Sequence, residues 1–319
     1  MAEVQTTAGP IDASELGKTL IHEHFRGRDE AVAHQWPHAY DEDEEWRLCI
    51  EQANAVKEHG VTTIVEPTAM LLGRNIQLLQ RIAAETGLNI VPCTGIYTYD
   101  HLPHYFENRD EDAMADLFVR DIEQGIQGTE VKAAFIKCAA DAPGVTANIE
   151  KVHRAAARAS VRTGKPIMAH SRPASNTGPR QVEIFLEEGV APEKIQIAHT
   201  GDTDDLDYIE GLLDKGVYVG LDRYGLPMFL PTDKRNTTTL ALLERGHVER
   251  MFISQDFVVA LDWFPPEAVE GIVAGGLVEE DWSMTLLFER IFPTLFEGGM
   301  TQDQLDTMLV ANPARWLSA

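Results

Sequence analysis

The chain alternates short apolar runs with longer amphipathic stretches almost from one end to the other. The runs have the length and composition of buried strands, whereas the stretches between them carry apolar residues three and four positions apart, which is typical of helices. The predicted strands span residues 19–24, 62–67, 89–97, 132–138, 166–171, 195–200, 217–222 and 251–256. The predicted helices span residues 41–58, 75–85, 112–124, 149–163, 179–188, 204–215 and 237–244, with two more around 284–296 and 303–310.

Eight strand–helix units in 319 residues predict a (β/α)8 TIM barrel that forms a single domain over residues 1–319. A doubly wound sheet is the competing architecture, but no G-x-G-x-x-G turn follows the first predicted strand. One long irregular stretch is expected at 257–280, which contains Pro265-Pro266 and Gly275-Gly276. On a barrel this stretch would lie over the C-terminal face, where active sites form.

The charge of the chain restricts its partners. Its 51 acidic and 27 basic residues give a net charge of −24, which argues against nucleic acid or an anionic membrane as a partner. The three cysteines have no C-x-x-C spacing, so neither a disulfide framework nor a thiolate zinc site is expected. The first residues lack a basic and apolar signal sequence, and no run reaches the ~18 apolar residues of a membrane span, so we expect a cytoplasmic protein.

Residues that can bind metals gather at the ends of the predicted strands. His22 and His24 end the first strand, and side chains at i and i+2 on a strand point the same way, so both imidazoles can bind one metal. Taken alone, this pair is equally compatible with core histidines that are satisfied by hydrogen bonds. The ends of the fourth, fifth, sixth and eighth strands add Lys137, His170, His199 and Asp256.

Four imidazoles and one carboxylate form a ligand set suited to zinc, cobalt, manganese or iron. The set is too large for one tetrahedral ion, which favours two divalent ions ~3.5–4 Å apart. A lysine directed at such cations requires that its charge be removed, for example by N-carboxylation of Lys137 to a bridging carbamate. The alternative for Lys137 is a surface or salt-bridged lysine. The remaining histidines are expected on the surface or in packing contacts: His34, His38, His59, His101, His104, His153 and His247.

In combination, these residues resemble the binuclear-metal phosphotriesterase family of the amidohydrolase superfamily. The runs 219–226 and 229–235 are similar to the phosphotriesterase-like lactonase branch, in which Tyr97 would correspond to a tyrosine that contacts the substrate. Two positions depart from the family's pattern. Gln255 stands where a histidine usually precedes the aspartate, and Ala198 stands in place of a glycine before His199.

The resemblance implies a lactonase that hydrolyses N-acyl-homoserine lactones (quorum quenching), with organophosphate triesterase activity on the side. A hydroxide that bridges the metals would be the nucleophile, and Asp256 would carry its proton to the leaving alkoxide. Tyr97 would donate a hydrogen bond to the substrate. Arg223 would orient the pocket, or else pair with Asp222 or Asp202; Trp263 would form a wall for the acyl chain, or else a buried loop anchor.

Three alternatives stay open from the sequence. The main activity could be phosphotriester hydrolysis, which uses the same metals and nucleophile. The barrel could instead bind metal without catalysis, although every position that can bind metal is filled. A mononuclear deaminase of the same superfamily would have no use for Lys137. Apolar faces on the first helices lead us to expect a homodimer.

Overall fold

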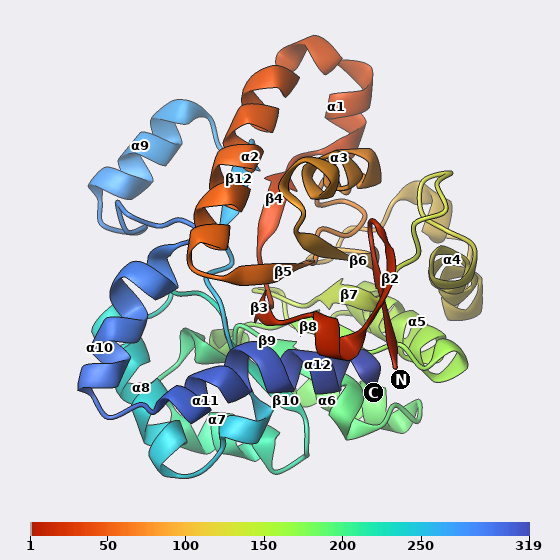
Figure 1. The fold of residues 1–319 in the computed structure, drawn as a ribbon. Helices are drawn as coiled ribbons and strands as arrows, with labels where there is room; N and C mark the ends of the chain where they lie inside the picture. The colour runs from red at the N-terminus through yellow and green to blue at the C-terminus, as the bar shows by residue number, and fades with distance from the viewer. Residues whose placement is uncertain (1) are drawn as a thin grey trace.

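A computed structural model describes residues 2–319, and eight parallel strands form its centre (Figure 1). Each strand pairs with the next along the chain, and the helices surround the sheet, so the predicted (β/α)8 barrel is confirmed. The strands, in order, are β3 (Lys18–Leu20), β5 (Val61–Glu66), β6 (Asn89–Gly95), β7 (Phe135–Ala139), β8 (Ile167–His170), β9 (Ile195–Ala198), β10 (Tyr218–Leu221) and β11 (Met251–Ile253).

The first and last strands of the barrel meet beyond their paired residues. The Asp256 N–H donates to the His22 carbonyl at 3.1 Å, and two further short strands, β4 (His24–Gly27) and β12 (Val258–Leu261), then pair in parallel. The prediction of one continuous strand over 19–24 is therefore wrong. The chain bends after β3, so that His22 lies in the bend and His24 begins β4.

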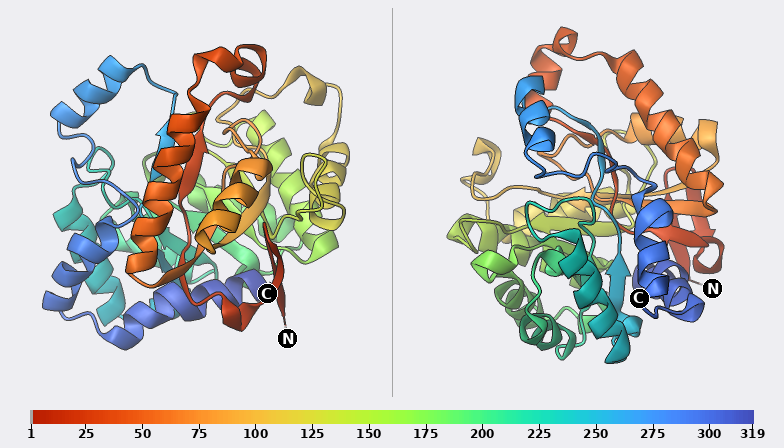
Figure 2. Two further views of the ribbon diagram at one scale, coloured as in Figure 1. Left: turned by 45° about the horizontal axis from the view of Figure 1, so that its top comes forward. Right: turned by 90° about the vertical axis from the view of Figure 1, so that its left-hand side faces the viewer.

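The prediction of an irregular stretch at 257–280 is also wrong. This stretch contains β12 and a helix, α9 (Pro266–Ala274). Proline is well tolerated in the first turn of a helix, where its missing N–H would have no partner within the helix, so Pro265-Pro266 begins α9. Figures 1 and 2 show α9 at the same end of the molecule as α1 (Glu30–Gln35) and α2 (Glu42–Glu58).

The predicted helices are present, with boundaries set by local capping. The Asp41 side chain accepts the Glu44 N–H and starts α2, and Gly87, in the left-handed conformation, ends α3. The outer helices are α3 (Ile76–Thr86), α4 (Glu111–Glu123), α5 (Ala147–Thr163), α6 (Thr177–Glu187), α7 (Leu206–Leu213) and α8 (Thr232–Glu244), followed by α10 (Phe292–Glu297), α11 (Gln302–Asp306) and α12 (Asn312–Ser318).

A short hairpin that was not predicted, β1 (Glu3–Thr6) with β2 (Gly9–Asp12), precedes the barrel. Its Val4 belongs to a buried cluster that also contains Phe135 of β7, Phe252 of β11 and Trp316 of α12. The two termini consequently lie close together (Figure 2). Within residues 2–319, no helix combines the length and apolar character needed to cross a bilayer.

Candidate metal centre and active site

The predicted ligands converge where the strands end. The Lys137 Nζ lies 2.9 Å from His22 Nε2, and the Nε2 atoms of His22 and His24 lie 3.3 and 3.2 Å from Asp256 Oδ1. His199 Nε2 lies 3.8 Å from Asp256 Oδ2. His22, His199 and Asp256 each offer a ligand atom within 4.8 Å of the others, so a metal ion fits among them.

His170 lies beside these residues and directs its Nδ1, rather than its Nε2, toward the centre. Its Nε2 lies 2.7 Å from Asp141 Oδ2, which leaves Nδ1 as the nitrogen available to a metal. That Nδ1 lies 3.2 Å from the Tyr97 hydroxyl, and the His170 ring centroid lies 4.5 Å from that of His199. His170 is therefore beside the cluster and already oriented by a carboxylate.

Unusual backbone conformations occur at two of the predicted ligands and beside a third. His199 (φ +63°) and Asp256 (φ +52°) both adopt the left-handed region, which is strained for residues other than glycine and recurs at functional sites. At Gly95 (φ +120°) an added Cβ would lie 1.9 Å from the Lys137 carbonyl oxygen. Only glycine therefore lets β6 approach the backbone of the lysine so closely.

Asp222 orients two of the histidines. Its Oδ2 lies 2.8 Å from His22 Nδ1, and its Oδ1 lies 3.0 Å from His199 Nδ1 and accepts the His199 N–H at 2.7 Å. The Thr68 hydroxyl lies 2.7 Å from His24 Nδ1 in the same way. With each Nδ1 engaged, the Nε2 atoms of all three rings are directed to the centre, as in metal sites whose ligands are held by outer carboxylates.

These outer partners are not predicted from the sequence. Asp222 closes the seventh predicted strand, which is a usable signal for its place at the barrel mouth, but its sequence position suggests only a partner for Arg223. Asp141 lies in the loop after β7 and Thr68 in the loop after β5. Nothing in the sequence pairs those two residues with His170 or His24.

The buried environment sets the charge of the centre. Burial lowers the pKa of His22 and of His170 to about 4 and that of His199 well below its usual range, so these imidazoles are neutral at pH 7, the form that can bind a metal. Burial opposes ionisation of Asp256, but the neighbouring imidazoles and the Arg223 guanidinium hold its pKa well below the usual range. Burial also lowers the pKa of Lys137 to about 8.

Arg223 connects the centre with the loop after β9. Its Nε donates to Asp256 Oδ2 at 2.9 Å, and its Nη1 donates to Asp202 Oδ2 at 3.0 Å. Of the two ion pairs considered from the sequence, the structure shows the one with Asp202, while Asp222 faces the histidines. The guanidinium also lies 4.4 Å from the centroid of the Phe229 ring, so Arg223 borders the pocket as well.

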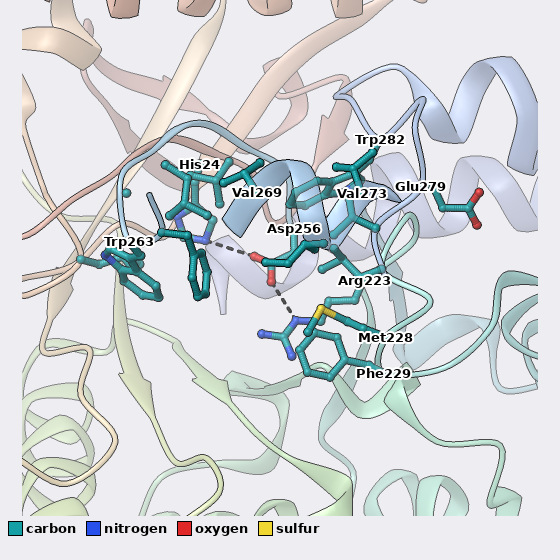
Figure 3. A pocket seen from close by; sticks show the side chains of 18 of the residues that line it. His24, Arg223, Met228, Phe229, Asp256, Trp263, Val269, Val273, Glu279 and Trp282 are labelled. Atoms are coloured by element: carbon teal, nitrogen blue, oxygen red, sulfur yellow. Dashed lines mark hydrogen bonds and ion pairs between the residues drawn. The ribbon is translucent and has the colours of Figure 1, made fainter. Parts of the chain in front are cut away.

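A cavity of about 390 Å³ opens beside His24 and Asp256 (Figure 3). Tyr97 lines it with its hydroxyl 2.8 Å from that of Tyr99, and the Trp263 ring centroid lies 6.0 Å from that of Tyr97. Trp263 is 40% exposed, so it is a wall of the cavity rather than a buried anchor. The apolar lining further includes Leu72, Leu226, Met228, Phe229, Val258, Leu261, Phe264, Val269, Ile272, Val273, Val278 and Trp282.

The chain was compared with known proteins. The sequence profile of the phosphotriesterase family matches residues 2–317, nearly its whole length. The chain belongs to the phosphotriesterase family. It is 47% identical to an aryldialkylphosphatase of Saccharolobus solfataricus over 310 residues, 97% of each chain. It is 40% identical to a phosphotriesterase homology protein of Mycobacterium tuberculosis, over 99% of this chain and 97% of the relative.

A solved structure, described as that of the phosphotriesterase from M. tuberculosis, superimposes with a TM-score of 0.92 and 40% identity, covering 99% of this chain and 98% of that one. Phosphotriesterase-family proteins are binuclear metal-dependent hydrolases. This chain is therefore a metal-dependent hydrolase, and the cluster around Asp256 is the part of its fold that could bind the metal.

Replacement of Asp222 by asparagine tests the outer partners of this phosphotriesterase-family centre. An amide cannot accept from both His22 Nδ1 and His199 Nδ1, so we expect metal affinity to fall ~10–100-fold in Asp222→Asn. The measurement is the metal retained per chain during titration with a chelator. Asp121→Asn is the control, because Asp121 holds Arg74 and Thr94 instead. Equal retention by both variants would contradict the role of Asp222.

Proposed function

We propose that this hydrolase is a binuclear-metal lactonase that acts on N-acyl-homoserine lactones and hydrolyses phosphotriesters as a side activity. The observation that carries the proposal is the apolar cavity, which starts at His24 and Asp256 and continues to Val269, Ile272 and Val273 on α9. A lactone ring at the ligand cluster would leave its acyl tail along this apolar wall. A compact phosphotriester does not need so extended a surface.

Two divalent ions, of zinc, cobalt, iron or manganese, would be held by His22, His24, Lys137, His170, His199 and Asp256. Lys137 shows best whether these residues suit two metal ions. It is completely buried, and its Nζ contacts His22 Nε2 and Met168 Sδ. Within residues 2–319 no carboxylate forms an ion pair with this lysine, which argues against the salt-bridged alternative. An N-carboxylated Lys137 would supply the missing anionic ligand, and its lowered pKa makes the neutral amine available for that reaction.

When bound, two divalent ions act as Lewis acids and lower the pKa of water to near neutrality. Asp256 is ionised at neutral pH, so its carboxylate can accept a proton and pass it to the leaving alkoxide. Arg223 holds Oδ2 of that carboxylate and thereby fixes its orientation. Burial raises the pKa of Tyr97 well above 10, so its hydroxyl stays protonated and can donate to the ester oxygen.

The choice of substrate is tested with metal-reconstituted protein. We expect kcat/KM for a long-chain acyl-homoserine lactone to exceed that for paraoxon by more than ~10-fold, because only the lactone uses the length of the cavity. A preference for paraoxon would make phosphotriester hydrolysis the main activity. Absence of metal-dependent turnover of both substrates would favour a non-catalytic barrel.

The Tyr97 hydroxyl is expected to distinguish the two substrates. In Tyr97→Phe, lactone hydrolysis should fall about fivefold, the ~1 kcal/mol of one hydrogen bond, whereas paraoxon hydrolysis should change less. Tyr99→Phe is the matched control, since it removes the neighbouring hydroxyl at 2.8 Å and keeps that of Tyr97. Equal losses on both substrates after Tyr97→Phe would show that this tyrosine does not select the lactone.

A further inference from the structure

Gln255, one of the two residues that depart from the family's pattern, is completely buried next to Asp256, and all its polar groups are hydrogen-bonded. Its Nε2 donates to Glu23 Oε1 at 3.1 Å and to the Met284 carbonyl at 2.8 Å, and its Oε1 accepts the Leu287 N–H at 3.0 Å. Its backbone carbonyl accepts from Trp282 Nε1 at 3.0 Å. Gln255 is therefore hydrogen-bonded to two separate parts of the site, the segment around Glu23 and the segment from Trp282 to Leu287.

The first part is the segment that carries two of the expected ligands. Glu23 lies between His22 and His24 and is completely buried. Its carboxylate accepts from the Ser254 hydroxyl at 2.6 Å, from the Gln255 N–H at 3.0 Å and from the Phe257 N–H at 2.8 Å, in addition to the Gln255 amide. The amide of Gln255 is thus one of four donors that hold this segment against the end of β11.

The second part is the wall of the cavity. Trp282 lines the cavity (Figure 3). It packs edge-on against Phe257, with ring centroids 4.9 Å apart. Its indole lies over Gly225, where an added Cβ would come within 2.1 Å of the ring. The indole N–H donates to the main-chain carbonyl of Gln255. Just after Trp282, the Met284 carbonyl and the Leu287 N–H are hydrogen-bonded to the Gln255 side chain.

A primary amide suits these contacts better than an imidazole does. The amide offers two donor hydrogens on one nitrogen and an acceptor oxygen, and Gln255 uses all three. A histidine has only two ring nitrogens, so it cannot donate to Glu23 and to Met284 while accepting from Leu287. The side-chain link from Glu23 to residues 284 and 287, just after Trp282, thus depends on glutamine at this position, whereas the main-chain carbonyl that accepts from Trp282 does not.

We propose that Gln255 is a positioning residue that fixes the Trp282 wall of the cavity against the His22–His24 segment and so determines how well bulky substrates bind. The lactone part of its test rests on the proposed function, whereas the position of Trp282 does not. Gln52 provides a matched control, because its Oε1 accepts the Met284 N–H at 3.2 Å and so anchors the same residue from α2.

The test compares Gln255→His with Gln52→Leu on substrate pairs that differ in bulk: butanoyl- and dodecanoyl-homoserine lactone, and dimethyl and diethyl paraoxon. In Gln255→His we expect KM for the larger member of each pair to rise about fivefold, while kcat and metal content stay within about twofold. Gln52→Leu should leave both KM values within about twofold. A uniform role in folding would not produce this split between large and small substrates.

Three results would overturn the proposal: an equal change for both members of a pair, loss of metal from Gln255→His, or the same selectivity in Gln52→Leu. If Gln255→His does not fold, Gln255→Met, which removes the three side-chain hydrogen bonds and keeps the length of the side chain, must show the same size-selective rise in KM. In 5-fluorotryptophan protein the Trp282 resonance must also move in Gln255→His, whatever the substrate. Failure of the unsubstituted protein to hydrolyse lactones would contradict the proposed function alone, because the paraoxon pair and the resonance would still report on Gln255.

Discussion

Lys137→Ala is expected to remove most of the bound metal and to lower kcat/KM by more than ~100-fold, the upper range for loss of an outer partner alone. The reason is the position of this lysine: its Nζ lies 2.9 Å from His22 Nε2 in a completely buried site without a carboxylate partner among residues 2–319. A methyl group there supplies no ligand, and the neutral imidazoles around it provide no negative charge to offset two divalent cations.

Elemental analysis and kinetics check this expectation together. Two metals per chain are expected in the unsubstituted protein, and a short carboxylate such as propionate should restore part of the metal and activity of Lys137→Ala by taking the place of the carbamate. Lys194→Ala is the control, because Lys194 donates to the Gly164 carbonyl outside the centre. One metal per active chain, or an active Lys137→Ala without added carboxylate, would refute the binuclear carbamate site.

The sequence predicted that these side chains converge because a parallel barrel brings the ends of its strands together. His170 ends β8, and His199 directly follows β9, so recognising each strand was enough to place the side chain at the mouth. Lys137 was predicted for the same reason, although β7 continues two residues beyond it, to Ala139. Local pattern and one rule of topology sufficed for these residues.

What the sequence did not predict depends on contacts between distant segments. β4 pairs with β12 across more than two hundred residues, and neither strand is long enough to be distinguished by its own pattern. The bend at His22 follows from this pairing, because the chain must leave the barrel sheet to enter it. Likewise, Asp222 can bind His22 and His199 at once only after β10 lies between its neighbours in the closed barrel.

Gln255 illustrates the difference between a motif and its structural meaning. In the sequence, Gln255 takes the place of the histidine that the family's pattern has before the aspartate. In the structure its amide joins Glu23 to the 284–287 segment, a pair of contacts that no spacing in the sequence indicates. The substitution was visible in the sequence, whereas its consequence required the fold.

Asp256→Asn is expected to retain part of the metal while kcat falls ~10²–10⁴-fold, the usual contribution of general acid–base transfer. In the structure Oδ1 faces His22 and His24, and Oδ2 accepts from Arg223 Nε at 2.9 Å. An asparagine oxygen can still serve as a ligand, but its amide has no basic site to take a proton at neutral pH. The nitrogen would also face the donating Nε of Arg223, so the side chain would lose that contact.

A second substitution separates proton transfer from positioning. Asp202→Asn weakens the other ion pair of Arg223, at 3.0 Å, without touching the carboxylate of Asp256, so it should cost less than ~10-fold in kcat. Kinetics at measured metal occupancy, with a comparison of rates in H₂O and D₂O, distinguishes the two effects. If Asp256→Asn kept near-normal kcat with full metal occupancy, this carboxylate would be a ligand only, and the proton would have to leave the reacting centre by another group.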